Sequence, residues 1–401
     1  MRVLISGASI AGPVLAFWLD RYGFDVTVVE RAPTLRKTGG HAVDLFRPAM
    51  EISAKMGVLP RIEDRATGTE RLRIYRDGAR RPILVDLTKI YRAASDRHVE
   101  IMRDDLGEIY YDAADVEYLF GDSITAISPD GEVTFERARA RRFDVVVGAD
   151  GLHSNVRRLV FGDDAGLTRY LGGYLAVASV PKSLAPDGEM IGHVEVGRMA
   201  GIYSAHHLDD ARAVFLFHSP ELQYHHRDAL RQKDLLRNAF AGMHPRVDGW
   251  LAHLDTTPAF YFDSITQLQL DSWSRGRVTL VGDAGYCPGP AVGGSTSLAV
   301  VGAYVLAGEL ARVRGDYQAA FAAYEQQMRE PVRRSRAFAR GAAKTVVPAS
   351  RAALWAVTRG AQLVSALPTP VSRAIAKLNT KGVRMHDSIP LPDYGAGVWQ
   401  H

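Results

Sequence analysis

The first thirty residues constrain the fold more than any other stretch, because they combine a strand, a glycine turn, a helix and a second strand that ends in an acid. Arg2–Ser6 is an apolar run, Ala11–Tyr22 carries apolar residues at helical spacing, and Asp25–Glu30 alternates as a strand does. Gly7 would permit a tight turn, and Gly12 would let the helix pack closely against the strand. The pattern predicts a βαβ unit that binds a dinucleotide, with the pyrophosphate at the helix N-terminus.

Three side chains refine this prediction. Glu30, followed by Arg31, lies where a carboxylate can accept hydrogen bonds from an adenosine ribose. The middle glycine of the G-x-G-x-x-G pattern is replaced by Ser9, so the backbone would approach the phosphates less closely there. The alternative interpretation is an ordinary βαβ crossover with glycines at its turns.

The composition limits the classes of function. A chain of 401 residues is long enough for two domains, and its 49 basic and 45 acidic residues nearly balance, so nothing indicates nucleic-acid binding. The only cysteine, Cys287, excludes an intrachain disulfide and a multi-cysteine zinc site and fits a reducing, cytoplasmic compartment. We expect no transmembrane segment. We also expect no metal site, because the adjacent histidines of His206-His207 and of His225-His226 would point to opposite faces of a strand.

The pattern changes in the middle of the chain. From about residue 167 to 270, short strands repeat with one clear helix, Asp234–Phe240, which predicts an antiparallel sheet domain inserted into an α/β domain. Phe143–Gly148 and Arg277–Val281 are mostly apolar, as parallel strands covered on both faces are. Pro348–Leu378 is amphipathic and basic, and a C-terminal helix packed on the body is favoured over one that lies on a membrane surface.

Two further motifs follow the N-terminal unit. The first is Val145–Arg158, in which a buried strand ends at Asp150-Gly151. The second is Gly282-Asp283-Ala284 after another buried strand, followed by Pro290, Gly293 and a helix. Each could be only a strand-to-helix turn, but three of them in this order make accidental agreement improbable.

In this order and spacing, the three motifs resemble the FAD-dependent aromatic hydroxylases of the p-hydroxybenzoate hydroxylase type, the group A flavoprotein monooxygenases. The resemblance extends from Met1 to about Ala343. It implies an α/β FAD-binding Rossmann-like domain with an inserted, largely antiparallel β-sheet substrate domain and a C-terminal helix. We expect the FAD-binding domain at residues 1–75, 95–166 and 271–345, the substrate-binding domain at 76–94 and 167–270, and a C-terminal helix and tail at 346–401.

The resemblance also implies roles for single residues. Arg103 would lie near the sugar and phosphate of the flavin nucleotide, Asp150 near both FAD and NAD(P)H, and Asp283 at the ribityl chain. The cofactor-binding residues would be Gly7, Ser9, Gly12, Glu30, Arg31, Arg103, Asp150, Asp283, Ser295 and Thr296. The residues bordering the isoalloxazine ring, where the chemistry occurs, would be Pro290, Gly293 and Gly294.

The glycine-rich loop before the helix of the third motif can also be interpreted from its chemistry alone. Reduced flavin carries negative charge at its N1–O2 edge, and backbone N–H groups that open a helix near Ser295–Ser297 would stabilise it. The family commonly has a histidine and an asparagine where this chain has Tyr286 and Ser297. These departures put the fine positioning of the flavin in question.

The resulting hypothesis is a monooxygenase. NADH or NADPH would reduce FAD, O2 would add at flavin C4a, and the hydroperoxide would transfer one oxygen to an aromatic or polyketide-like molecule. No second strand–GxGxxG–helix unit is present, so the nicotinamide nucleotide would bind transiently. The substrate pocket would lie between the flavin and the inserted sheet, with candidate lining residues Tyr203, His206, Phe215, Phe217, His218 and Tyr261.

The sequence also bears on other functions. The helical tail resembles the single-component enzymes that modify tetracycline-type antibiotics. Flavin-dependent halogenation needs a W-x-W-x-I-P signature, which the isolated tryptophans of this chain do not form. A flavin-binding sensor or scaffold without efficient turnover is the remaining alternative, suggested by the altered loop from Tyr286 to Ser297.

Overall fold

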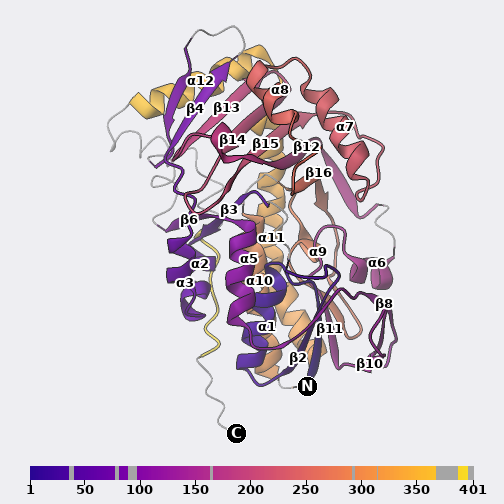
Figure 1. The fold of residues 1–401 in the computed structure, drawn as a ribbon. Coiled ribbons are helices and arrows are strands. Elements are labelled where there is room, and N and C mark those ends of the chain that lie inside the picture. Colours follow the sequence, from indigo (N-terminus) through magenta and orange to yellow (C-terminus); the bar gives the residue numbers. More distant parts are fainter. Residues whose placement is uncertain are drawn as a thin grey trace.

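The computed structural model describes residues 1–35, 40–76, 81–88, 97–162, 166–290, 294–313, 315–366 and 387–395. Two sheets lie at opposite ends of the molecule, with long helices running between them (Figure 1). This arrangement confirms the predicted fold class, a Rossmann-like α/β domain that carries an inserted sheet and a C-terminal helix.

The first sheet has six strands and is parallel except for its edge pair. Its central strands are fully or almost fully buried, which explains their continuous valine and isoleucine runs. In spatial order the strands are β17 (Ser274–Arg275), β18 (Val278–Leu280), β11 (Val145–Gly148), β1 (Arg2–Ser6), β2 (Asp25–Glu30) and β7 (Glu117–Phe120).

Helices pack around this sheet. The helices α1 (Ala11–Arg21) and α10 (Ser295–Val313) contact each other, and α10 also packs on α11 (Tyr317–Val346), the long helix that reaches the second sheet (Figure 1). The shorter helices are α2 (Arg47–Lys55), α3 (Leu59–Asp64), α5 (Arg103–Ala113), α6 (Asn155–Phe161) and α9 (Asp283–Tyr286).

One helix bears on the membrane prediction. Among the described residues, α10 is long and apolar enough to cross a membrane by length and composition alone. Its residues 295–308 carry no charged side chain, and Glu309 and Arg312 lie in its last turns. However, 78% of its apolar window is buried inside the protein, which is the environment of a core helix.

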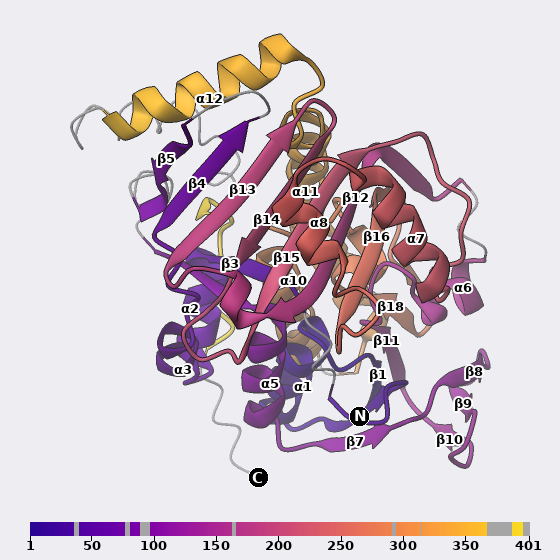
Figure 2. The ribbon, with the colours of Figure 1, turned by 45° about the horizontal axis from the view of Figure 1, so that its top comes forward.

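The second sheet has seven strands and is antiparallel except where β13 meets β4. The helices α7 (Ala229–Phe240) and α8 (Pro245–Leu251) cover one face, and α12 (Arg351–Ala366) lies along the β5 edge (Figure 2). In spatial order the strands are β16 (Phe260–Leu268), β12 (Thr168–Pro181), β15 (Asp210–His218), β14 (Arg198–Tyr203), β13 (Glu189–Glu195), β4 (Arg71–Arg76) and β5 (Ile83–Asp86).

Two small sheets complete the fold. The first pairs β3 (Ala42–Phe46) with β6 (His98–Met102), and the second joins β8 (Ile124–Ile127), β9 (Glu132–Phe135) and β10 (Arg141–Arg142). The hairpin of β8 and β9 is the one that the Pro129-Asp130-Gly131 turn predicts.

The strand pairing also bears on the domain boundaries. All of β4 belongs to the seven-stranded sheet, because it pairs in parallel with β13 over Arg71–Arg76. A boundary after residue 75 would therefore cut this strand, and we place the boundary before Arg71 instead.

Candidate active site

The turn after β1 brings three backbone segments into close contact. Gly7 has a φ of +109°, and a Cβ built on it would lie 2.6 Å from the carbonyl oxygen of Ala149 at the end of β11. A Cβ on Gly12 would lie 1.9 Å from the Gly7 carbonyl oxygen. Only glycine fits at either position, so the first helix starts directly against the two central strands.

The acid at the end of β2 closes this turn. Glu30 accepts hydrogen bonds from the N–H of Ala8 at 3.0 Å and of Ala32 at 2.8 Å. It thereby joins the β1 turn to the end of β2, and the next residue, Arg31, is exposed beside it. The sequence prediction placed Glu30 near this turn but gave no sign of its hydrogen bonds to the backbone.

The serine that replaces the middle glycine makes a specific contact. Its hydroxyl accepts a hydrogen bond from Nη2 of Arg103 at 3.1 Å. Arg103 begins α5, and its side chain also packs against Gly40, where a Cβ would lie 2.9 Å from the Arg103 Cβ. Ser9 therefore ties the first turn to the arginine that the sequence assigned to the same site.

The second motif is organised by a buried carboxylate. Asp150 accepts hydrogen bonds from the Ser154 hydroxyl and from the N–H groups of Asn155 at 2.9 Å and Val156 at 3.1 Å. Burial raises the pKa of Asp150, and these hydrogen bonds oppose the rise. The carboxylate therefore fixes the N-terminus of α6 directly behind the β1 turn, where Ser6 also reaches it at 3.4 Å.

A fully buried arginine joins the second motif to the third. Arg157 donates from Nη1 to the carbonyl of Ala284 at 2.9 Å and from Nη2 to that of Leu152 at 2.6 Å. An arginine in the first turn of a helix is usually exposed, so sequence reasoning assigned it no role. Its two contacts hold the Asp150 and Asp283 turns in one place.

The third motif begins α9 with Asp283. Burial raises the pKa of this carboxyl group, while the positive charge of Arg103 acts in the opposite direction. Arg103 also lowers the pKa of His41, although burial is the larger cause of the fall to about 4. Ser9, Arg103 and Asp283 thus bring the first and third motifs to a single site, with His41 neutral beside them.

The loop that follows is described in part. Pro290, at the end of the described stretch, is half-buried, and Gly294 has a φ of +82° directly before α10. Gly293 lies outside the described residues. Ser295 and Thr296 form the first turn of α10, so their N–H groups belong to its free N-terminal end.

The two departures from the family pattern have structural explanations. Tyr286 is buried against α10, where a Cβ on Gly302 would lie 1.9 Å from its hydroxyl oxygen, and that oxygen accepts a hydrogen bond from Tyr324 at 3.2 Å. Ser297 accepts from the N–H of Phe46 at 3.0 Å and donates to the carbonyl of Asp44 at 3.2 Å. Tyr286 therefore packs into the helical core, and Ser297 fastens α10 to β3.

The predicted pocket residues lie on two different faces of the seven-stranded sheet. Phe215 and Phe217 lie in the core under α7 and α8, whereas the alternate residue Leu216 packs towards α11. Tyr203 and Tyr261 lie on the α11 side. Tyr203 accepts a hydrogen bond from the N–H of Ala42 at 2.7 Å, so it bridges the sheet to β3.

Two of the candidate pocket residues, Tyr261 and His218, differ in their contacts. Tyr261 lies 6.1 Å from His41, ring centre to ring centre, and therefore faces the turns described above. His218 bonds the carbonyls of Gly172 and Val347 at 2.9 Å each, which gives it a structural place. Strand alternation contradicts the prediction for Phe215 and Phe217, which lie on the other face of the sheet. His218 lies on the α11-facing side, where both of its ring nitrogens are engaged by backbone carbonyls.

Sequence reasoning missed Arg212 on β15. Its side chain is almost fully buried and forms an ion pair with Asp210 at its Nη1, and its Nε has no partner among the described residues. It lies opposite Tyr203 in the strand register, on the same α11-facing side of the sheet. An arginine within a predicted strand is normally read as a solvent-facing residue, so the sequence offered no signal.

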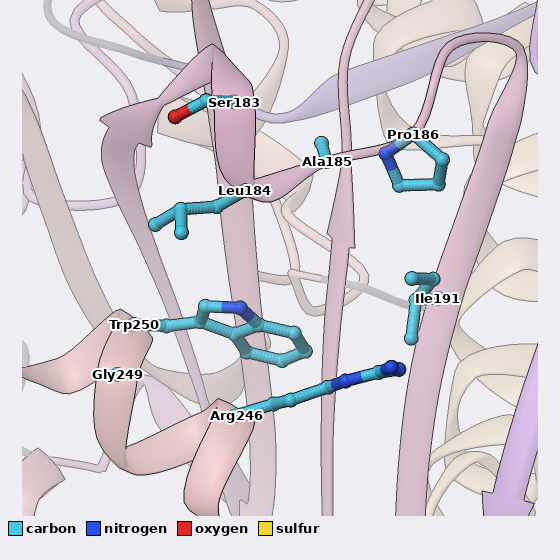
Figure 3. Close-up of a pocket in the computed structure, with 8 residues that line it drawn as sticks. All are labelled: Ser183, Leu184, Ala185, Pro186, Ile191, Arg246, Gly249 and Trp250. Carbon is cyan, nitrogen blue, oxygen red and sulfur yellow. The ribbon is translucent and has the colours of Figure 1, made fainter.

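A separate pocket of about 470 Å³ opens on the other face of the sheet (Figure 3). Trp250 and Arg246 of α8 point into it from one side, opposite Pro186 and Ile191. It shares no residue with the three turns. The described residues also contain no group of three or more histidine, cysteine or acidic side chains that could hold a metal ion.

The fold and the convergence of the three turns are those of a dinucleotide-binding domain. A family model described as an FAD-binding domain matches residues 1–339. A flavin-dependent monooxygenase of Legionella longbeachae is 36% identical over 338 residues, covering 82% of this chain and 85% of the relative. A monooxygenase of Cercospora beticola is 32% identical over 388 residues, covering 91% and 92%.

Solved structures agree with these relatives. The tetracycline destructase Tet(51) is 31% identical and superposes with a TM-score of 0.83, covering 98% of this chain and 99% of that one. Klebsiella pneumoniae HpxO complexed with FAD and uric acid shares the fold, with a TM-score of 0.72 at 22% identity over 96% of this chain and 97% of that one. The chain belongs to the FAD-dependent monooxygenases of group A, as its three motifs predicted.

Proposed function

We propose that this enzyme uses NADH or NADPH to insert one oxygen atom from O2 into an aromatic or polyketide-like small molecule. The observation that carries the proposal is the joining of three distant turns into one cradle by two arginines, Arg103 and Arg157. The similarity to a tetracycline destructase supports a polycyclic, oxygen-rich substrate.

The residues present fit FAD. A Cβ on Gly7 or Gly12 would collide with the backbone of Ala149 or of Gly7, so these glycines let α1 begin tightly against β1 and β11. The free N–H groups at the N-terminus of α1 would then be available to a pyrophosphate. We infer that Glu30 and Arg31 hold the adenosine end, with Ser9 and Arg103 at the phosphates. In the same scheme Asp150 shapes the turn behind the cofactor and Asp283 holds the ribityl hydroxyls.

The far end of the cradle would hold the ring system. The N-terminal end of α10 offers free N–H groups at Ser295 and Thr296, next to Gly294, and such groups stabilise negative charge on a reduced ring. We assign Pro290, Gly293 and Gly294 to its border. Bound FAD would supply the activated oxygen, and the chain would orient the substrate and exclude water.

The substrate would lie between this cradle and the α11-facing side of the seven-stranded sheet. Tyr203, Tyr261 and Arg212 point there from three different strands. The guanidinium of Arg212 could donate hydrogen bonds to phenolate or enolate oxygens of a polyketide, because its Nε is buried without a described partner. Residues 71–88 and 167–270 would form the substrate-binding unit, and the enzyme would act in the cytoplasm.

A screen on the purified protein tests the proposal. We expect a yellow protein that consumes NAD(P)H and O2 faster when a suitable phenolic or polyketide compound is present, with a product heavier by one oxygen atom. A colourless protein that takes up no added FAD would refute the flavin assignment. A yellow protein that NAD(P)H never reduces would instead indicate a sensor or scaffold without turnover.

A further inference from the structure

The last described helix leaves an unusual surface in solvent. α12 rests on the β4–β5 edge of the seven-stranded sheet, at the end of the molecule away from the N-terminus (Figure 2). Among its described side chains the most buried is a polar one, Thr358, which is 2% exposed and accepts a hydrogen bond from Nη1 of Arg76 at 3.3 Å. An amphipathic helix that packs on a protein normally buries its large apolar residues instead.

Three large apolar residues of α12 are exposed, whereas Leu354 is half-buried. Trp355 is 60% exposed, Val357 50% and Leu363 64%, and Leu84 of the neighbouring strand β5 is 61% exposed. A single exposed leucine is ordinary. Four large exposed apolar side chains on one helix and its supporting strand indicate a surface that binds a membrane or another molecule. We call these residues, together with Arg351 and Arg359 of the same helix, the α12 surface.

The stretch of chain that leads into α12 and forms it is basic. Residues 331–366 contain no aspartate or glutamate and seven basic residues, against a formal net charge of +4 for the whole chain, so the rest of the chain is net negative. Arg333 and Arg334 pair with Glu330. Four of the others are exposed and form no ion pair with a described carboxylate: Arg340, Lys344, Arg351 and Arg359.

We propose that the α12 surface binds an anionic lipid bilayer. A tryptophan beside exposed aliphatic residues and arginines is the combination that helices use at the boundary between headgroups and acyl chains. The apolar side chains would enter the boundary, and the basic residues would face the negative headgroups. Docked in this way, the seven-stranded sheet would stand beside the membrane, where lipophilic substrates concentrate.

Two other occupants fit the charges or the apolar residues, but not both. A nucleic acid would neutralise the basic residues yet would leave Trp355, Val357 and Leu363 in water, because phosphate contacts bury no aliphatic side chain. A second copy of this chain could cover the apolar residues, but it would bring two positively charged stretches together. Of these three occupants, an anionic bilayer is the one that satisfies both features of the surface.

Flotation of the FAD-loaded protein with lipid vesicles tests this inference. We expect the protein to float with vesicles of phosphatidylcholine and phosphatidylglycerol in equal parts and not with phosphatidylcholine alone, and to detach as salt is raised. Each arginine should contribute about fivefold, so Arg351→Gln with Arg359→Gln should weaken binding about twenty-five-fold. The matched control removes two exposed arginines at the opposite end of the molecule, Arg139→Gln with Arg142→Gln, and should bind as the parent does.

A second pair of variants tests the apolar side chains. Trp355→Gln with Leu363→Gln keeps every charge and should lose vesicle binding, while NADPH oxidation without vesicles stays unchanged. Tryptophan emission of the parent should shift to the blue on binding, because Trp355 is exposed and Trp18, Trp250 and Trp273 are buried. Trp355→Phe should abolish the shift.

Three outcomes would overturn the inference. The first is no flotation with anionic vesicles, and the second is flotation that the α12 variants leave unchanged. The third is retention of duplex DNA in a gel that depends on Arg351 and Arg359 but not on Trp355 and Leu363, which would assign the surface to nucleic acid. None of these depends on whether the enzyme hydroxylates its substrate.

Discussion

Arg103 is the residue whose removal tests the cradle most sharply. Its guanidinium donates to Ser9 at 3.1 Å, adds to the fall that burial causes in the pKa of His41, and opposes the rise that burial causes in the pKa of Asp283. It therefore stands between the first and third motifs. A hydrogen bond from a charged group contributes about 1.5–3 kcal/mol. Since about 1.4 kcal/mol corresponds to tenfold in affinity, Arg103→Gln should raise the dissociation constant of FAD by about 10- to 150-fold.

The assay is a titration of the flavin-free protein with FAD, followed by quenching of flavin fluorescence. Arg103→Lys keeps the charge but not the planar fork, and should fall between the parent and Arg103→Gln. Arg142→Gln, at an exposed ion pair with Asp130, serves as the control and should bind FAD as the parent does. An Arg103→Gln protein that is folded and binds FAD within twofold of the parent would refute the placement of this arginine at the cofactor.

Three further predictions concern packing and protonation. Gly12→Ala would place a Cβ 1.9 Å from the Gly7 carbonyl oxygen, so unfolding in urea should show a loss of about 1–3 kcal/mol or more together with loss of bound flavin, and an unchanged midpoint would contradict the close approach. Gly302→Ala should destabilise the protein by about 1–3 kcal/mol, because its Cβ would contact the Tyr286 hydroxyl. Adding Tyr286→Phe to this variant should restore at least about half of the lost stability without changing the flavin spectrum, whereas additive losses in the double variant would show that the two residues do not touch. Burial, with His244 and Arg246 adding to it, lowers the pKa of His193 from 6.5 to about 4. The unfolded chain therefore takes up the proton first, and the free energy of unfolding should fall as pH drops from 6.5 to about 4, by at most about 1.4 kcal/mol per pH unit for this group. In urea unfolding, His193→Gln should flatten this pH dependence and His253→Gln should not, and equal slopes in both variants would show that His193 is not its cause.

Much of the fold could be predicted because its signals are local. The strand, turn and helix of the N-terminal unit appear almost at the predicted bounds, since Gly7, Gly12 and the β-branched run before Glu30 each act within a few residues. The inserted sheet was also foreseen from its short strands. The boundary at β4 was misplaced because a parallel partner more than a hundred residues away decides it.

The candidate site was less predictable because its contacts span the chain. Ser9 meets Arg103 across 94 residues, and Ser297 meets Phe46 across 251. The departure at Tyr286 could not be understood without the facing Gly302 on α10. Strand alternation predicts that Phe215 and Leu216 point to opposite faces, but only the packing of the helices shows which face looks toward the cradle.

Incorporation of heavy-isotope oxygen is the most direct test of the account. The enzyme would be supplied with NADPH, heavy-isotope O2 and a compound that stimulates NADPH oxidation, and the product would be weighed by mass spectrometry. The account predicts one heavy oxygen atom in each product molecule, from a protein that retains FAD. Oxygen derived from water, or NADPH oxidation that yields only hydrogen peroxide with every compound tried, would contradict it.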